Sequence, residues 1–253
     1  MRLIQERAGT DPALEQAMAT ALLHRVAAGA RGALLRCYRP PPTVAFGRRD
    51  SLLPGFVRAA AAARERGYEP VIRAAGGRAA AYDEGCLVLD EIRPGGHALA
   101  DIGERFAGEA ARQAEALRGL GVDARVGEVP GEYCPGEFSI NAGGKRKLAG
   151  SAQKIIRGGW LLSTAVVIAP APSLAAVLDA VYAALGLDWD PATVGAVADE
   201  APGVGVDDVR RVLLAASAQR DSLVPGTLDD EDRAAAAAAL GRHRPSARRE
   251  PGV

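Results

Sequence analysis

The stretch that decides the fold is GGKRKLAGSAQKIIRGGWLLSTAVVI, residues 143–168. Its two ends, Lys145–Ala149 and Trp160–Ile168, predict two strands, the second of them rich in apolar and β-branched residues. The residues AGG at 142–144 predict a hairpin turn that leads into the first of them. The small residues of GSA, 150–152, would let a ligand approach the backbone closely, or would form an ordinary tight connection between strands.

All three lysines of the chain, Lys145, Lys147 and Lys154, fall within this stretch, whereas 28 of the 31 basic residues are arginine. Lysine is a compact ammonium whose pKa moves readily on burial, and arginine is a planar fork that keeps its proton. A site that needs a point charge or a proton donor could not accept arginine instead. The alternative is a solvated hairpin face, and composition alone leaves both interpretations open.

Outward from this stretch, helix-period and strand-period patterns alternate along the chain. Asp11-Pro12 is a helix start, and the helix it opens is expected to end near Gly29. Further helices are expected over Val57–Arg66 and Ile102–Leu117. The other expected strands are Leu34–Tyr38, Thr43–Gly47, Pro70–Ala74, Cys86–Leu89, Ala124–Val129 and Glu137–Asn141. The fold class is therefore α+β, with mostly antiparallel sheets flanked by helices.

The composition changes near the APAP run at 169–172. Helical patterns follow over Leu174–Leu185, Val206–Ala218 and Leu228–Leu240. We therefore expect a main domain over 1–170 and a small helical part over 171–253, whose basic tail from Gly241 onward is frayed.

Composition excludes several classes of function. Hydrophobic residues make up 48% and charged residues 25%, as in a globular protein with a full core. Thirty-one acidic residues balance thirty-one basic ones, so no general attraction to nucleic acid or to a membrane is expected. No signal-like N-terminus or long apolar run is present, which favours a cytoplasmic location. Three widely spaced cysteines without a CxxC predict neither a disulfide framework nor a metal site.

One cysteine stands in an unusual loop, GEVPGEYCPGEFSI, at 127–140. Prolines 130 and 135 flank Cys134 and rigidify the turn that carries it. A lone cysteine is usually a small buried hydrophobe. Lys147 lies thirteen residues further on, however, and a nearby ammonium lowers the pKa of a thiol and can hold a carbonyl oxygen. Cysteine and lysine are thus a plausible pair for acyl transfer.

Three segments together resemble the biotin/lipoate protein ligase superfamily, over Asp11 to about Ile168. They are PTVAFGRRDS at 42–51, IRAAGGRAAAYDEGCLVLD at 72–90 and the stretch at 143–168. Within the superfamily, EYCPGEF at 132–138 is similar to the loop of the cysteine-dependent octanoyl/lipoyl amidotransferases. The resemblance implies a biotin/lipoate ligase-like catalytic domain with the small helical part appended.

The resemblance also implies roles for particular residues. Cys134 would accept the acyl group, and Lys147 would position the acyl carbonyl. The residues expected to bind substrate are Arg73, Gly76, Gly77, Arg78, Asp83, Lys145, Gly150, Ser151 and Ala152. Strand alternation puts Lys145 and Lys147 on one face, and spacing favours Lys147 as the residue in the site. Asp83 is favoured as a turn cap over an acid–base group.

ATP-dependent lipoate ligases carry a serine and three glycines followed by Val-Tyr-His-Asp, where this chain has AGGRAAAYD at 75–83. The histidine and the third glycine are missing, and Arg78 would crowd or grip a phosphate. This departure weakens the expectation of adenylation chemistry.

The resemblance implies an acyltransferase of protein lipoylation that needs no cofactor or metal. An octanoyl or lipoyl group would arrive on a carrier, the H protein of glycine cleavage or acyl carrier protein. It would pass through a cysteine thioester to a lysine of a lipoyl domain of the 2-oxoacid dehydrogenases. The alternatives are an ATP-dependent lipoate-protein ligase and a non-catalytic protein that binds acyl carriers or lipoyl domains.

Overall fold

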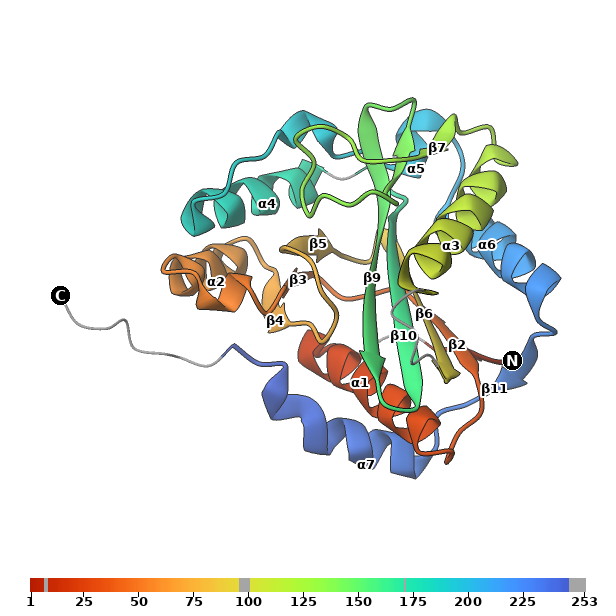
Figure 1. Ribbon diagram of the computed structural model, residues 1–253. Helices are drawn as coiled ribbons and strands as arrows, with labels where there is room; N and C mark the ends of the chain where they lie inside the picture. The colour runs from red at the N-terminus through yellow and green to blue at the C-terminus, as the bar shows by residue number, and fades with distance from the viewer. Residues whose placement is uncertain (7–8, 96–100, 171, 246–253) are drawn as a thin grey trace.

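Two sheets organise the chain in the computed structural model, which describes residues 1–6, 9–95, 101–170 and 172–245 (Figure 1). The large sheet has eight strands in the order β11-β1-β2-β6-β10-β9-β8-β7, and the small one has the order β4-β3-β5. The strands are β1 Arg2–Gln5, β2 Leu34–Tyr38, β3 Thr43–Phe46, β4 Glu69–Ile72, β5 Ala80–Tyr82, β6 Cys86–Pro94, β7 Ala124–Val126, β8 Ile140–Ala142, β9 Arg146–Ile156, β10 Gly159–Val167 and β11 Val224–Gly226. Most neighbours are antiparallel, which confirms the predicted fold class.

Strands β9 and β10 form the long hairpin at the centre of the large sheet (Figure 1). The predicted strand Lys145–Ala149 was too short, because β9 continues through 150–152 to Ile156. The small residues that suggested a connection are instead paired with β10, whose backbone supplies their hydrogen bonds. Side chains 150, 152 and 154 consequently alternate with 151, 153 and 155 across the two faces of the sheet.

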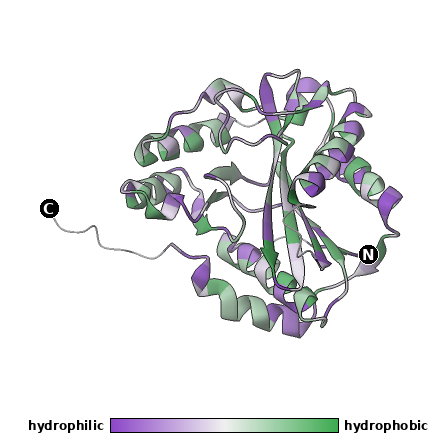
Figure 2. Cartoon of the chain, viewed as in Figure 1, coloured by the Kyte–Doolittle hydropathy of each residue, from purple (hydrophilic) through white to green (hydrophobic). Residues whose placement is uncertain are grey.

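Helices cover both faces of the large sheet (Figure 1). They are α1 Pro12–Ala27, α2 Phe56–Glu65, α3 Asp101–Arg118, α4 Pro172–Leu185, α5 Val197–Glu200, α6 Val206–Arg220 and α7 Asp230–Ala239. Helices α3 and α6 share a core with one face of the sheet. On the other side, α2 and α4 pack with the small sheet, and hydrophobic colouring predominates on both helices in Figure 2.

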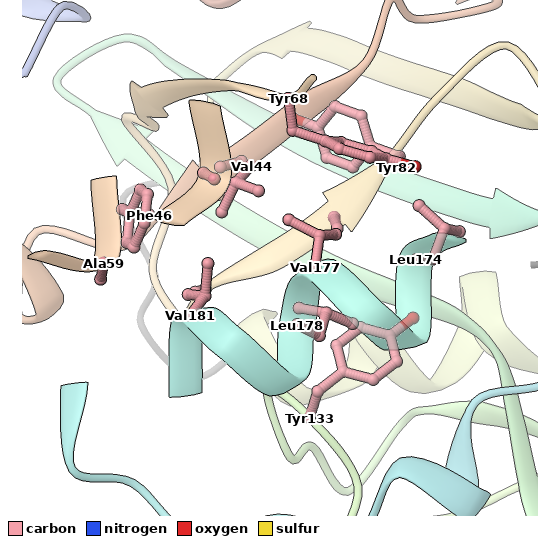
Figure 3. Close-up of a cluster of buried hydrophobic side chains, with 14 of the residues drawn as sticks. Val44, Phe46, Ala59, Tyr68, Tyr82, Tyr133, Leu174, Val177, Leu178 and Val181 are labelled. Atoms are coloured by element: carbon pink, nitrogen blue, oxygen red, sulfur yellow. The ribbon is translucent and has the colours of Figure 1, made fainter. Parts of the chain in front are cut away.

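The core between the small sheet, α2 and α4 reaches the cysteine loop. Val44 and Phe46 of β3 meet Val177 and Val181 of α4 in this cluster (Figure 3). Tyr133, the residue before Cys134, belongs to the same cluster and is buried. The hydrophobic core therefore holds the loop in place at Tyr133, the residue next to Cys134.

The C-terminal residues join the rest of the fold through several elements. Helix α4 packs on α2, α7 packs along α1, and β11 pairs with β1 in parallel. The three predicted helices are confirmed, whereas β1, β5 and β11 were not predicted. The division at residue 170 stays a prediction. The expectation of a frayed tail is wrong for His243, which is buried and accepts a hydrogen bond from the backbone of Ile72; residues 246–253 lie outside the described part of the chain.

Candidate active site

A cavity of about 1280 Å³ lies against the face of β9 and β10, beside the cysteine loop. Residues from α1, the Gly76-Gly77 turn, β6 and the first turns of α3 complete its wall. Cys134 and Lys147 both line it, although thirteen positions separate them in the sequence. The hairpin and the loop thus bring together the two residues that the sequence singled out.

Cys134 has a backbone conformation that few side chains adopt. Its φ is 44°, the one positive φ outside glycine among the described residues. The Cys134 N–H donates to the Tyr182 hydroxyl at 2.7 Å, and that hydroxyl donates to the Ala79 carbonyl at 2.9 Å. A tyrosine of α4 therefore holds a strained residue in place, which is a common arrangement at functional sites.

The sulfur of Cys134 faces a cation and a glycine turn. Arg73 Nη2 lies 3.2 Å from Sγ and also donates to the Arg78 carbonyl at 2.5 Å. Gly77 has φ 98°, and a Cβ there would come within 2.8 Å of Sγ. The turn can approach the thiol only because position 77 has no side chain.

Lys147 is 2% exposed and closes the loop from the other side. Its Nζ donates to the Cys134 carbonyl at 2.7 Å and to the Tyr133 carbonyl at 3.1 Å. It also lies 3.3 Å from Glu132 Oε1, which accepts from the Ser139 hydroxyl at 2.6 Å. Lys147 thus hydrogen-bonds the backbone of both Tyr133 and Cys134, and so holds this part of the loop against β9.

The charges around the thiol change its chemistry. Burial raises the pKa of Cys134, but the Arg73 and Lys147 cations outweigh burial and the net direction is downward. Burial lowers the pKa of Lys147, against the opposing effects of Cys134 and Glu132. The other thiols show the contrast: burial raises the pKa of Cys37 to about 11 and that of Cys86 to about 12. Cys134 is the thiol that the surroundings favour as a thiolate.

Most of the residues expected to bind substrate line the cavity: Arg73, Gly76, Gly77, Arg78, Gly150, Ser151 and Ala152. Arg78 also pairs with the buried Asp50 at 3.1 Å. Two residues lie elsewhere. Lys145 is exposed in the turn before β9 and is not part of the strand, so of Lys145 and Lys147 it is Lys147 that lines the cavity, as Lys154 also does. Asp83 caps a turn, accepting from the Gly85 N–H and the Tyr68 hydroxyl at 2.9 Å each.

Sequence reasoning missed the supports of the site. Tyr182 is 48 residues from Cys134 and lies in the small helical part expected over 171–253, to which the sequence assigned no site residue. Glu132 lies two residues before Cys134. Its position in the loop could have suggested it as the carboxylate partner of Lys147. Among the described residues, no group of three or more potential ligands is arranged to hold a metal. Within that same part of the chain, no helix is apolar and long enough to cross a bilayer.

The fold is that of the lipoate-protein ligases. A crystal structure of lipoate-protein ligase A bound with ATP aligns with a TM-score of 0.76 and 21% identity, covering 95% of this chain and 94% of that one. A structure of a T. acidophilum protein with bound lipoic acid aligns with a TM-score of 0.74 and 22% identity, covering 95% of each chain.

The sequence places the chain more narrowly. The family model of the lipoyl protein ligase A/B catalytic domain matches residues 11–218, so the chain belongs to this family. The octanoyl-[GcvH]:protein N-octanoyltransferase of Geobacillus kaustophilus is 35% identical over 147 residues, which is 58% of this chain and 50% of that protein. Its namesake from Anoxybacillus flavithermus is 35% identical over 139 residues, 55% of this chain and 50% of that protein. The chain matches about half the length of these relatives.

Proposed function

We propose that the protein moves an octanoyl or lipoyl group from a lysine of one carrier protein to a lysine of another, through a thioester on Cys134. The observation that carries the proposal is a single activated thiol, held between Arg73 and Lys147 on a strained loop at a large cavity. Family membership supports it, and so do the activities for which the relatives are named.

In the first half-reaction, the Cys134 thiolate attacks the acyl carbonyl of the donor amide. A carbon–sulfur bond forms, the carbon–nitrogen bond breaks, and the departing lysine nitrogen takes up a proton. In the second half, the amine of the acceptor lysine attacks the thioester and loses a proton. The new carbon–nitrogen bond forms, and sulfur leaves as the thiolate. The transfer needs no ATP, because the thioester keeps the acyl group activated.

The cations serve both steps electrostatically. Arg73 lies next to Sγ and stabilises the thiolate as nucleophile and as leaving group. Lys147 adds its charge from beneath the loop. A direct hydrogen bond from Lys147 to the acyl oxygen requires it to give up one of the three oxygens it now faces, those of Tyr133, Cys134 and Glu132.

The partners we propose are acylated and acceptor carrier proteins. The relatives' names specify GcvH, the counterpart of the H protein expected above, as the donor or acceptor. A structural neighbour from Thermoplasma acidophilum is described together with its E2 lipoyl domain, the second kind of partner expected. Acyl carrier protein remains an alternative donor; its acyl group is held as a thioester, so a carbon–sulfur bond would break in the first half-reaction and a thiolate would leave in place of the lysine nitrogen. A cytoplasmic location, where thiols stay reduced, completes the proposal.

The test is intact-mass analysis of the protein after incubation with octanoylated GcvH and no ATP. We expect an octanoyl adduct on the wild type and on Cys37→Ala, a control that removes a buried thiol, and none on Cys134→Ser. Lys147→Arg should slow adduct formation strongly, because the longer planar fork cannot replace the compact ammonium under the loop.

Two other outcomes would overturn the proposal. Modification of a lipoyl domain that needs lipoate and ATP and survives Cys134→Ser would identify an ATP-dependent ligase. Tight binding of octanoylated GcvH without any adduct would identify a non-catalytic binding protein.

A further inference from the structure

The turn that follows β3 lies against the glycine turn that covers the thiol. A Cβ on Gly47 would come within 1.8 Å of the Gly77 carbonyl oxygen, and a Cβ on Gly77 would come within 2.8 Å of Cys134 Sγ. The Gly47 N–H donates to the Asp50 carboxylate at 3.0 Å, which fixes the backbone between them. Residues 48 and 49 therefore follow directly from a backbone contact with the turn beside the thiol.

Two adjacent arginines of this turn, Arg48 and Arg49, carry charges without a partner. Both are exposed and both line the cavity, so they lie at its entrance. Arginines elsewhere in the fold bind carboxylates, as Arg25, Arg31 and Arg220 do. Within the described residues, by contrast, neither the Arg48 nor the Arg49 guanidinium has a hydrogen bond or an ion pair. Two cations at the entrance are therefore free to bind a partner.

The entrance carries a local surplus of positive charge, although the whole chain has as many acidic as basic residues. The acidic residue of the turn, Asp50, is fully buried and pairs with Arg78 at 3.1 Å, so its charge is already balanced. Of the described residues that line the cavity, Asp90 and Glu137 are acidic, and of these two Glu137 alone is exposed. A partner at the entrance therefore meets mostly positive charge.

An apolar side chain lies beside the two arginines. Leu52 is 70% exposed, the largest exposed fraction among the large hydrophobic side chains of the described residues, and it also lines the cavity. A single exposed leucine is ordinary. Next to two unpaired guanidinium groups, however, it gives the entrance the mixed apolar and charged character of a protein–protein interface, where arginine is enriched. We call Arg48, Arg49 and Leu52 the entrance patch.

We propose that the entrance patch is the docking surface for the acylated carrier protein, and that it binds an acidic surface of the carrier beside the acylated lysine. This inference rests on the function proposed above and specifies how the donor is recognised. The carrier's lysine has a stem of only four carbons, so the carrier surface must approach the entrance before the acyl carbonyl can reach Cys134. Guanidinium groups bind carboxylates through paired hydrogen bonds, which would orient the carrier as well as attract it.

The test compares two octanoyl donors by the rate at which the Cys134 adduct forms: octanoylated GcvH and a neutral small thioester, octanoyl-N-acetylcysteamine. The small donor has no protein surface to dock, so it reports on the thiol alone. When Arg48→Glu and Arg49→Glu are combined, the GcvH concentration that gives half the maximal rate should rise about tenfold, because two attractions become repulsions. The rate with the small donor should fall far less. Raising salt from about 50 mM to about 200 mM should slow the reaction of GcvH more in the wild type than in the double variant.

Three further variants locate the effect. Arg48→Lys combined with Arg49→Lys keeps the charge and should retain most of the carrier affinity. Leu52→Ser should raise the half-maximal GcvH concentration by a similar factor at both salt concentrations, because salt does not screen an apolar contact. Arg157→Glu is the matched control, since Arg157 is exposed and has no partner among the described residues. It lies in the turn after β9, does not line the cavity, and should behave as the wild type does.

Equal dependence on GcvH concentration and on salt in the wild type and the double glutamate variant would overturn the docking surface while leaving the thioester mechanism intact. A wild type that sediments as a dimer without carrier, and as a monomer in the double variant, would assign the entrance patch to a second copy of the chain instead. A wild type that gains no adduct from either donor would refute the proposed function. Sedimentation of the protein with octanoylated GcvH would then decide the docking surface separately: a complex with the wild type but not with the double variant would support it, and the absence of both complexes would overturn it.

Discussion

Replacing Arg73 with methionine would test whether this guanidinium keeps Cys134 reactive. Arg73 Nη2 is 3.2 Å from the sulfur, and both residues are part-buried at the cavity wall. At an effective dielectric of about 20, two unit charges at that distance attract by about 5 kcal/mol. Lys147 remains in the variant, and losing one buried ion offsets part of the cost. A net loss on the order of 2 kcal/mol lowers the reactivity of the thiol at neutral pH by about 30-fold.

The assay is the rate of alkylation by iodoacetamide, followed by intact mass over a range of pH. The wild type should gain one adduct, because the pKa of Cys37 is raised to about 11 and that of Cys86 to about 12. Its rate should fall on acidification only when the pH passes through the lowered pKa of Cys134, and in Arg73→Met this fall should move to higher pH. Arg73→Lys, which keeps the charge, should recover part of the rate. A folded Arg73→Met that is alkylated at the wild-type rate at neutral pH would refute the electrostatic argument.

Three further changes test the support of the site. Gly77→Ala should abolish thioester formation, because the new Cβ would lie 2.8 Å from Cys134 Sγ. The same variant should lose about 1–2 kcal/mol of unfolding free energy in urea. Gly76→Ala is the control, since a Cβ there meets open space, and it should keep the wild-type stability. Tyr182→Phe should cost about 1–3 kcal/mol of unfolding free energy and slow alkylation, since the Cys134 N–H loses its acceptor; an unchanged unfolding curve would contradict this role. Burial lowers the pKa of His243, so the stability it contributes is present at neutral pH and is lost as the pH falls. The melting temperature should therefore drop by roughly 2 °C more in the wild type than in His243→Gln between about pH 7 and about pH 5, and equal drops would count against the assignment.

The fold was predictable where local patterns suffice. Strand β2 matches its predicted bounds, Leu34–Tyr38, and α1 begins at the predicted cap because Asp11 accepts a hydrogen bond from the Ala13 N–H. Strands β1 and β11 escaped prediction because each is short and pairs with residues far away in the sequence. The small residues of β9 looked like a connection because only pairing with β10 makes them a strand.

The same distinction between local patterns and distant packing holds for the candidate site. Cys134 and Lys147 were found from residue type, spacing and resemblance. The geometry that activates the thiol was not, because the φ of Cys134 and its bond to Tyr182 depend on how α4 packs.

The placement of the lysines makes the protein an unusually selective target for amine-directed reagents. Of the chain's three lysine side chains, Lys147 is shielded, Lys145 is exposed in the turn before β9, and Lys154 is half-buried near the far end of that strand. Apart from the exposed α-amino group of Met1, amine cross-linkers would therefore report on what touches β9. Coupling through the lysines to a sensor chip would place that strand toward the chip, and with it the cavity, which Lys154 lines. Carrier-binding measurements on this protein should be made with the carrier immobilised instead.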